Sequence, residues 1–277
     1  MVVVPDPATC PACSGSHVFV IERWPLGKRH VACGCNDCGL VFVHPFATPE
    51  ELQAFYAPGG RWSTVHGDDR VPKKRGAGRA LMGALDQYFP ASQPADGASV
   101  LDFGCGAGAW LNEFQDRGWT TYGIEPSTDL PFERHQRLLD IPDEPRFDMF
   151  IAYHVLEHLP QPLDTLQRLA GALREGGYCF LSVPRVDALA AHGKIHYCLQ
   201  RHNHIVAFTE ACLRGLLARA GIQTLAVLDC LDRPDTPSRR IRLLGRKTVV
   251  TVPMPDVSGA LRKVVHDVDL LVTAAHA

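Results

Sequence analysis

The sequence predicts an α/β fold, a doubly wound and mostly parallel sheet preceded by a small zinc ribbon. Two observations carry this prediction. From residue 98 onward, short apolar segments alternate with amphipathic helical ones, as the strands and covering helices of a parallel sheet do. Within the first 47 residues, two C-x-x-C pairs have the spacing of a zinc site. The 277 residues are enough for one large domain with such an appendage.

The ribbon prediction rests on four cysteines. Cys10 and Cys13 form one pair, and Cys35 and Cys38 form the second after 21 intervening residues. Four thiolates bind zinc tetrahedrally and leave no open position for water or substrate, so we expect a structural zinc ion. A ribbon of about 45 residues buries little surface, so the metal would supply most of its stability. Cys33 is a fifth thiol, which the two-residue spacing leaves as a spare or a replacement ligand.

Residues 48–97 predict a helical linker or lid between the ribbon and the main domain. Thr48 and Glu51 have the spacing of a capping box, with a proline in the first turn, and this pattern predicts the start of a helix. The helix is expected to stop at Pro58. A second helix is predicted over residues 79–89, because apolar side chains recur there on one side.

Residues 98–252 predict the main domain, and residues 253–277 an amphipathic helix that packs on its own domain. A basic run over residues 239–247 is expected on a solvated face. Strands are predicted over residues 98–103, 120–125, 147–153, 177–183, 222–229 and 241–252, and helices over residues 107–117, 162–173 and 209–220.

The composition is that of a globular protein and excludes several classes of function. Hydrophobic residues make up 46% of the chain and charged residues 21%. A net charge of -2 gives no general attraction to nucleic acid, so nucleic acid is not an expected partner. No apolar run approaches the roughly 18 residues of a membrane span, and the first twelve residues lack the pattern of a signal peptide. We expect a cytoplasmic protein without membrane contact; the oligomeric state stays open, a homodimer included.

The stretch "VLDFGCGAGAWL", residues 100–111, predicts a nucleotide-binding turn. Its glycines permit positive φ and a close approach of a ligand to the backbone. A Walker-type phosphate loop needs Gly-Lys-Ser/Thr, which is absent, and a dinucleotide fold needs G-x-G-x-x-G, whereas this chain has G-x-G-x-G after an acid. S-adenosylmethionine fits instead, because Asp102 can meet its amine. Glu125 ends the second strand, 17 residues after Gly108, where it can bind both ribose hydroxyls.

With the downstream stretches "GIEPS", "FDMFIAYHVLEHLPQPLDTLQRLAGALREGGYCFLSVP" and "FTEACLRGLLARAGI", this turn resembles the class I S-adenosylmethionine-dependent methyltransferases over about residues 98–225. The ribbon followed by "GLVFVHPFATPEELQAFY" resembles the zinc module on one branch of these enzymes. The resemblance implies a Rossmann-like sheet of seven strands. It also implies cofactor contacts by Asp102, Gly104, Gly106, Gly108, Glu125 and His154, with Asp140 and Ile141 at the adenine. One departure is that only 21 residues separate Glu125 from Phe147, so the helix between them must be very short or lost.

Two segments offer histidines for the chemistry. His154, Glu157 and His158 formally match the H-x-x-E-H motif of inverted zinc peptidases. The segment instead follows a buried strand, as the corresponding methyltransferase loop does, so we expect Glu157 and His158 to anchor the loop and His154 to border the active site. The second segment, residues 201–209, reads "RHNHIVAFT". It resembles the E-H-x-x-x-F stretch of sugar C-methyltransferases, with Asn203 in place of the acid. His204 is thereby the candidate general base, and a structural hydrogen bonder is the alternative.

The expected function is methyl transfer from S-adenosylmethionine to a small-molecule acceptor, with oxygen as the expected methylated atom and secondary or sugar metabolism as the setting. Two alternatives remain. One is a zinc-containing ribosomal-RNA base methyltransferase, against which the net charge of -2 counts. The other is a cofactor-binding scaffold without turnover, against which the presence of both Asp102 and Glu125 counts.

Overall fold

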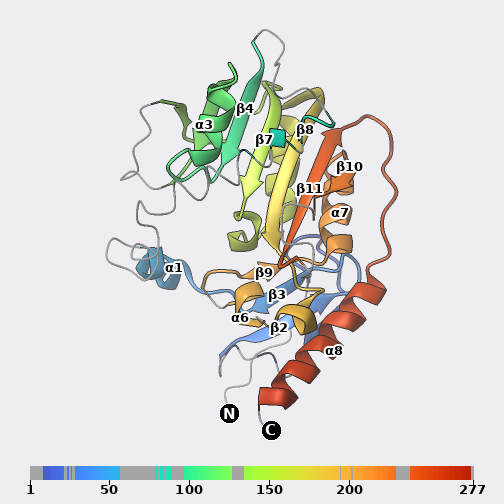
Figure 1. The fold of residues 1–277 in the computed structure, drawn as a ribbon. Helices are drawn as coiled ribbons and strands as arrows, with labels where there is room; N and C mark the ends of the chain where they lie inside the picture. Colours follow the sequence, from blue (N-terminus) through green and yellow to red (C-terminus); the bar gives the residue numbers. More distant parts are fainter. Residues whose placement is uncertain are drawn as a thin grey trace.

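The structure is a computed structural model with two sheets, one of seven strands and one of four (Figure 1). No described helix is long and apolar enough to cross a membrane. The structure describes residues 9–21, 24, 26, 29–56, 79, 82–83, 85–88, 97–126, 134–193, 195–200, 202–228 and 238–275.

The larger sheet confirms the predicted α/β class. Its strands lie in the order β10-β11-β8-β7-β4-β5-β6, and β11 alone runs antiparallel to its neighbours. Because β4 lies between β5 and β7, the chain order reverses at β4, and a crevice for ligands is expected outside its carboxyl end. The strands are β4 (Ser99–Phe103), β5 (Thr120–Ile124), β6 (Gln136–Leu138), β7 (Phe147–Tyr153), β8 (Leu173–Pro184), β10 (Ile222–Val227) and β11 (Arg240–Lys247).

Helices cover both faces of this sheet. Helix α3 (Ala109–Gln115) packs on one face, where Trp110 and Phe114 join a cluster with Phe180 of β8. Helices α4 (Pro162–Gly171) and α7 (Glu210–Arg219) contribute leucines to a second cluster that includes strand residues of β7 and β8. Thr209 caps α7, since its Oγ1 accepts a hydrogen bond from the Cys212 amide at 3.0 Å.

The seventh strand, β6, has no counterpart among the predicted elements. It is only three residues long and pairs on one side, with β5. An edge strand with the polar sequence Gln-Arg-Leu carries neither an apolar run nor alternation, so pattern analysis has nothing to detect. Of the residues between Glu125 and β6, 127–133 lie outside the described residues, so the expectation of a very short or lost helix there is not addressed.

The smaller sheet joins the ribbon to the rest of the chain. Strands β1 (Val18–Ile21), β2 (Val31–Cys35) and β3 (Val41–His44) form an antiparallel meander, and β9 (Val206–Ala207) adds a fourth strand beside β3. The Val43 amide also donates to the Ile205 carbonyl at 2.9 Å. The ribbon sheet is thus completed by residues that follow His204.

The predicted linker is described in part. Helix α1 (Pro49–Tyr56) starts with the expected capping box, in which the Thr48 amide donates to Glu51 Oε2 at 2.9 Å and the Glu51 amide to Thr48 Oγ1 at 3.3 Å. Of the second predicted helix, the described Met82 and Leu85 are helical and buried. The predicted stop at Pro58 lies outside the described residues.

The carboxyl-terminal helix, α8 (Ser258–Ala275), packs within the chain, but its partner is the ribbon (Figure 1). Leu261, Val264 and Val268 are buried in a cluster with ribbon residues such as Val41 and Val43. The short helix α5 (Leu189–His192) also meets α8, where the Ala190 amide donates to Asp267 Oδ2 at 3.2 Å. An apolar stripe on a helix predicts burial but does not identify the surface that buries it.

The prediction of a solvated face for the basic run is wrong for Arg242. This side chain is 4% exposed, because β11 is an inner strand whose residues face the covered sides of the sheet. Arg240, two residues earlier on the same face, reaches two phenols. Its Nε lies 3.4 Å from the Tyr197 hydroxyl, and its Nη1 lies 3.4 Å from the Tyr153 hydroxyl.

Candidate cofactor and active site

The glycine turn follows β4 directly and closes over the end of β5. Gly104, Gly106 and Gly108 all have positive φ, at 77°, 53° and 71°. The Gly104 amide donates to the Ile124 carbonyl at 2.8 Å. A Cβ at Gly104 would lie 2.4 Å from Cγ2 of Val155, so both the conformation and the space require glycine there.

Two predicted cofactor-binding carboxylates lie at this turn. Glu125 Oε2 accepts a hydrogen bond from the Gly106 amide at 2.9 Å, which places the end of β5 against the turn. Asp102, in β4, is 1% exposed. The fold therefore brings together an acid, a bare backbone turn and a second acid at the point where the strand order reverses, which is the geometry expected of a nucleoside site.

Asp140 and Ile141 follow β6, whose carboxyl end lies beside that of β5 because Ile124 pairs with Leu138. Asp140 Oδ1 accepts from the Ile141 amide at 2.8 Å, and its Oδ2 accepts from Arg168 at 2.9 Å. The Arg168 guanidinium holds the pKa of the Asp140 carboxyl below its usual value. The side chain of Asp140 is therefore engaged with the protein, and the adenine contact stays a prediction.

His154 and Glu157 form a hydrogen-bonded pair at the end of β7. His154 Nδ1 lies 2.8 Å from Glu157 Oε1. Burial alone would raise the pKa of Glu157, but electrostatic attraction to the His154 imidazole and the hydrogen bond with it hold this pKa below its usual value, so the carboxylate stays ionised. An ionised carboxylate keeps the proton on Nδ1, which makes Nε2 of His154 the basic nitrogen.

The conformation of His154 also points to a function. Its φ is 58°, which is strained for a residue with a side chain and is typical of functional positions. The Nε2 atom is buried and has no hydrogen-bond partner among the described residues. A buried ring nitrogen without a partner is unfavourable, and a polar group of a bound ligand would satisfy it.

His204 also lies close to Glu157 and is 8% exposed. Its Nδ1 donates to the Tyr197 carbonyl at 2.5 Å, and its ring centroid lies 5.0 Å from that of His158. Burial lowers the pKa of His204 to about 4, so it is neutral but weakly basic. The structure thus brings both predicted histidines to Glu157, while their roles in the chemistry stay predictions.

Sequence reasoning missed Tyr153, which lies beside His154, and Trp110, which lies beside Tyr153. The Tyr153 ring lies 4.9 Å from the His154 ring and 4.8 Å from the Trp110 ring, measured between centroids. Arg240 joins them through the Tyr153 hydroxyl. Trp110 belongs to the recognised glycine-turn stretch and Tyr153 to a predicted strand. Only the packing of α3 on β7 brings their rings together.

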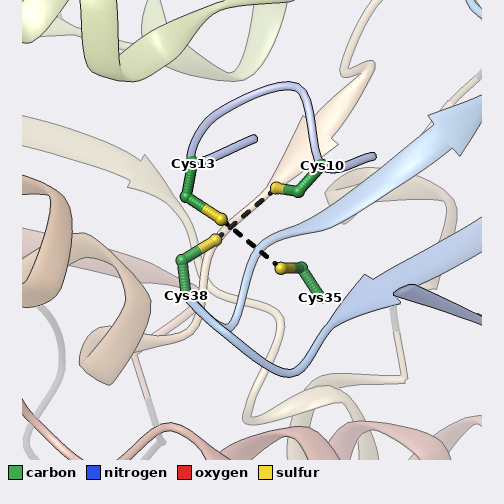
Figure 2. A group of neighbouring side chains, drawn as sticks. All are labelled: Cys10, Cys13, Cys35 and Cys38. Atoms are coloured by element: carbon green, nitrogen blue, oxygen red, sulfur yellow. Dashed lines mark hydrogen bonds between the residues drawn. The ribbon is translucent and has the colours of Figure 1, made fainter. Parts of the chain in front are cut away.

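The four cysteines of the ribbon converge as the zinc prediction requires (Figure 2). The Sγ atoms of Cys10 and Cys38 lie 3.6 Å apart, as do those of Cys13 and Cys35. Zinc–sulfur bonds of about 2.3 Å in a tetrahedron give sulfur–sulfur edges of about 3.8 Å. The donor set therefore fits zinc, and Cys33, on β2, is not part of this group.

A family model described as a methyltransferase domain matches residues 74–227, more than half of the chain. Among curated proteins, a ubiquinone biosynthesis O-methyltransferase from Xanthomonas axonopodis pv. citri is 29% identical over 72% of this chain and 90% of its own length. A tRNA U34 carboxymethyltransferase from Pseudoalteromonas translucida is 27% identical over 52% of this chain and 51% of its own. The chain thus spans about half the length of that tRNA enzyme.

Solved structures support the same fold. The 1,6-didemethyltoxoflavin-N1-methyltransferase of Burkholderia thailandensis, with bound 1,6-didemethyltoxoflavin and S-adenosylhomocysteine, aligns with a TM-score of 0.55 at 21% identity. The alignment covers 80% of this chain and 97% of that one. The plantazolicin methyltransferase BpumL with S-adenosylhomocysteine aligns with a TM-score of 0.54 at 13% identity, covering 71% of this chain and 93% of its own. The larger sheet is therefore Rossmann-like, as the resemblance implied.

Proposed function

Because the chain belongs to the methyltransferase domain family, we propose that it is an S-adenosylmethionine-dependent methyltransferase and that it transfers the donor's methyl group to a small-molecule acceptor. One observation carries the placement of the donor. The Glu125 carboxylate lies against the Gly106 amide at the switch point, with Asp102 buried in the preceding strand. We assign the ribose hydroxyls to Glu125 and the methionine amine to Asp102.

The proposed acceptor carries a hydroxyl. Methyl transfer is an in-line displacement at the sulfonium carbon, and an oxygen acceptor loses a proton as the new bond forms. We assign His154, at the end of β7 next to β4, the role of taking that proton on Nε2, with Glu157 stabilising the imidazolium. The names of the Xanthomonas O-methyltransferase and the 1,6-didemethyltoxoflavin-N1-methyltransferase support a small acceptor.

Of the two predicted catalytic histidines, we assign the base to His154. A base is most effective when its pKa lies near the working pH, and a pKa of about 4 makes His204 a poor proton acceptor. We assign His204 a positioning role beside Glu157. Comparing the His204→Asn and His154→Asn variants, as described in the Discussion, tests which of the two histidines is the base.

An RNA acceptor is the second candidate, because the tRNA U34 carboxymethyltransferases are relatives at 27% and 32% identity. The net charge of -2 counts against it, since RNA binding depends on neutralising phosphates. We therefore expect methyl label from S-adenosylmethionine to enter the small-molecule fraction of a bacterial extract and not its RNA. Label in RNA would replace the proposal with the second candidate, and no transfer by folded, cofactor-binding protein would favour a scaffold without turnover.

Replacing Glu125 by Gln is expected to weaken binding of S-adenosylhomocysteine about 10- to 100-fold, because a hydrogen bond to a charged group contributes about 1.5–3 kcal/mol. Titration calorimetry measures this. Glu144→Gln is the matched control, since Glu144 is an exposed glutamate in the loop before β7. Equal affinities for the two variants would remove Glu125 from the ribose site.

A further inference from the structure

A second group of potential metal ligands lies away from the four cysteines. Glu157, His158 and His204 each offer a donor atom, and these atoms all lie within 4.8 Å of one another. Glu157 and His158 belong to η3 (Leu156–His158), the single-turn helix after β7, while His204 directly precedes Ile205 and β9. Two separate segments of the chain therefore meet at this point.

The hydrogen bonds of the two histidines fix which ring nitrogen carries the proton. His158 Nδ1 lies 2.9 Å from the Asn203 carbonyl, and His204 Nδ1 lies 2.5 Å from the Tyr197 carbonyl. A carbonyl oxygen only accepts hydrogen bonds, so each Nδ1 must donate. In a neutral imidazole Nε2 then carries no proton and presents a lone pair, and this orientation by a backbone carbonyl is typical of metal-binding histidines.

The carboxylate supplies the third lone pair. Glu157 is fully buried, and its Oε1 is bonded to His154. Its Oε2 is buried and has no hydrogen-bond partner among the described residues. An ionised oxygen left in this state is costly, whereas a cation shared with two imidazoles would satisfy it.

The histidines are also in the protonation state that binds metal. Burial lowers the pKa of both His158 and His204, so both rings are neutral near neutral pH. Their backbone is held on two sides, because η3 contacts the β9 segment and β9 is bonded to strand β3 of the ribbon. The donor atoms are therefore positioned by the fold before any ion binds.

We propose that Glu157, His158 and His204 form a second metal site, which takes a divalent transition-metal ion such as Zn²⁺, Fe²⁺ or Mn²⁺. Two imidazoles and one carboxylate are a donor set that suits these ions. Three protein ligands leave a position open for water or an oxygen of another molecule, unlike the closed set of four cysteines. Glu157 then connects the ion to His154. Ion binding here does not depend on the proposed reaction.

The test is a metal titration of the full-length protein with its cysteine site already filled with zinc. Titrating Co²⁺ is expected to fill one further site per chain, with a visible spectrum that lacks sulfur-to-cobalt charge-transfer bands. His204→Asn and Glu157→Gln are expected to weaken this binding by about 100-fold or more, since even outer partners of metal ligands contribute 10- to 100-fold. His266→Asn, an exposed histidine of α8, is the matched control and should bind like the wild type.

Three outcomes would overturn the proposal. One is a wild-type protein that is folded by circular dichroism, holds its zinc and takes up no second ion. Another is equal uptake by the wild type and the folded His204→Asn variant. The third is a high-resolution structure, grown with the ion in excess, that shows only water between the three side chains. Because the first and third outcomes use the wild type, the test does not depend on whether Glu157→Gln folds.

Discussion

Replacing His154 by Asn is expected to lower the turnover number by about 10²- to 10⁴-fold, the contribution typical of a general base. Asparagine is the suitable replacement because it tolerates the positive φ of 58° at this position and has no basic nitrogen. The affinity for S-adenosylhomocysteine should change little, because Asp102, Glu125 and the glycine turn are untouched. Stopped assays that count S-adenosylhomocysteine formed per enzyme measure the turnover, and calorimetry measures the affinity.

The matched variant in this experiment is His204→Asn, which alters the other predicted catalytic histidine. If His204 only helps to position Glu157, replacing His204 should lower the turnover number less than replacing His154 does. Unchanged turnover in His154→Asn, with a large loss in His204→Asn, would return the role of base to His204. A comparable loss of S-adenosylhomocysteine affinity in His154→Asn would instead make it a cofactor contact.

Removing a zinc ligand is expected to unfold the ribbon. Structural zinc in small fingers binds with an apparent free energy of about 10–16 kcal/mol at pH 7, which matches or exceeds the total stability of about 5–15 kcal/mol of a typical domain. In Cys38→Ser we expect the loss of bound zinc and of hydrogen-exchange protection in β2 and β3. The effect should spread to β9 and the buried face of α8, since both pack on the ribbon.

Cys33→Ala is the control for this experiment, because Cys33 is buried in β2 but lies outside the group of four sulfur atoms. It is expected to keep one zinc per chain and to lose only packing. Zinc content by mass spectrometry and exchange at single amides give both readouts. A folded ribbon in metal-free Cys38→Ser would contradict a structural role for the ion, and zinc loss in Cys33→Ala would make Cys33 a ligand.

The features that could be predicted from the sequence are those that depend on residues close together in the chain. The glycine turn is recognisable because three nearby positions must all adopt positive φ beside a buried strand. The cysteine pairs are recognisable because two ligands on one tight turn need a fixed spacing. The capping box at Thr48 and the helix cap at Thr209 are equally local, and the structure contains the hydrogen bonds of both.

Features that depend on distant partners were not predictable in this way. Strand β9 is two residues long and exists because β3 offers it an edge, which no pattern around Val206 reveals. The burial of Arg242 follows from the inner place of β11 in the sheet. The weak basicity of His204 follows from its burial by distant segments of the chain. The motif around His204 therefore could not show that this histidine is a poorer base than its position in the motif suggests.

The most direct test of cofactor binding at the switch point is a calorimetric titration of the zinc-loaded wild-type protein with S-adenosylhomocysteine. We expect saturable binding of one molecule per chain, weakened in Glu125→Gln and unchanged in Glu144→Gln. Folded, zinc-loaded protein that takes up neither S-adenosylhomocysteine nor S-adenosylmethionine would contradict the assignment of Asp102, the glycine turn and Glu125 to the methyl donor.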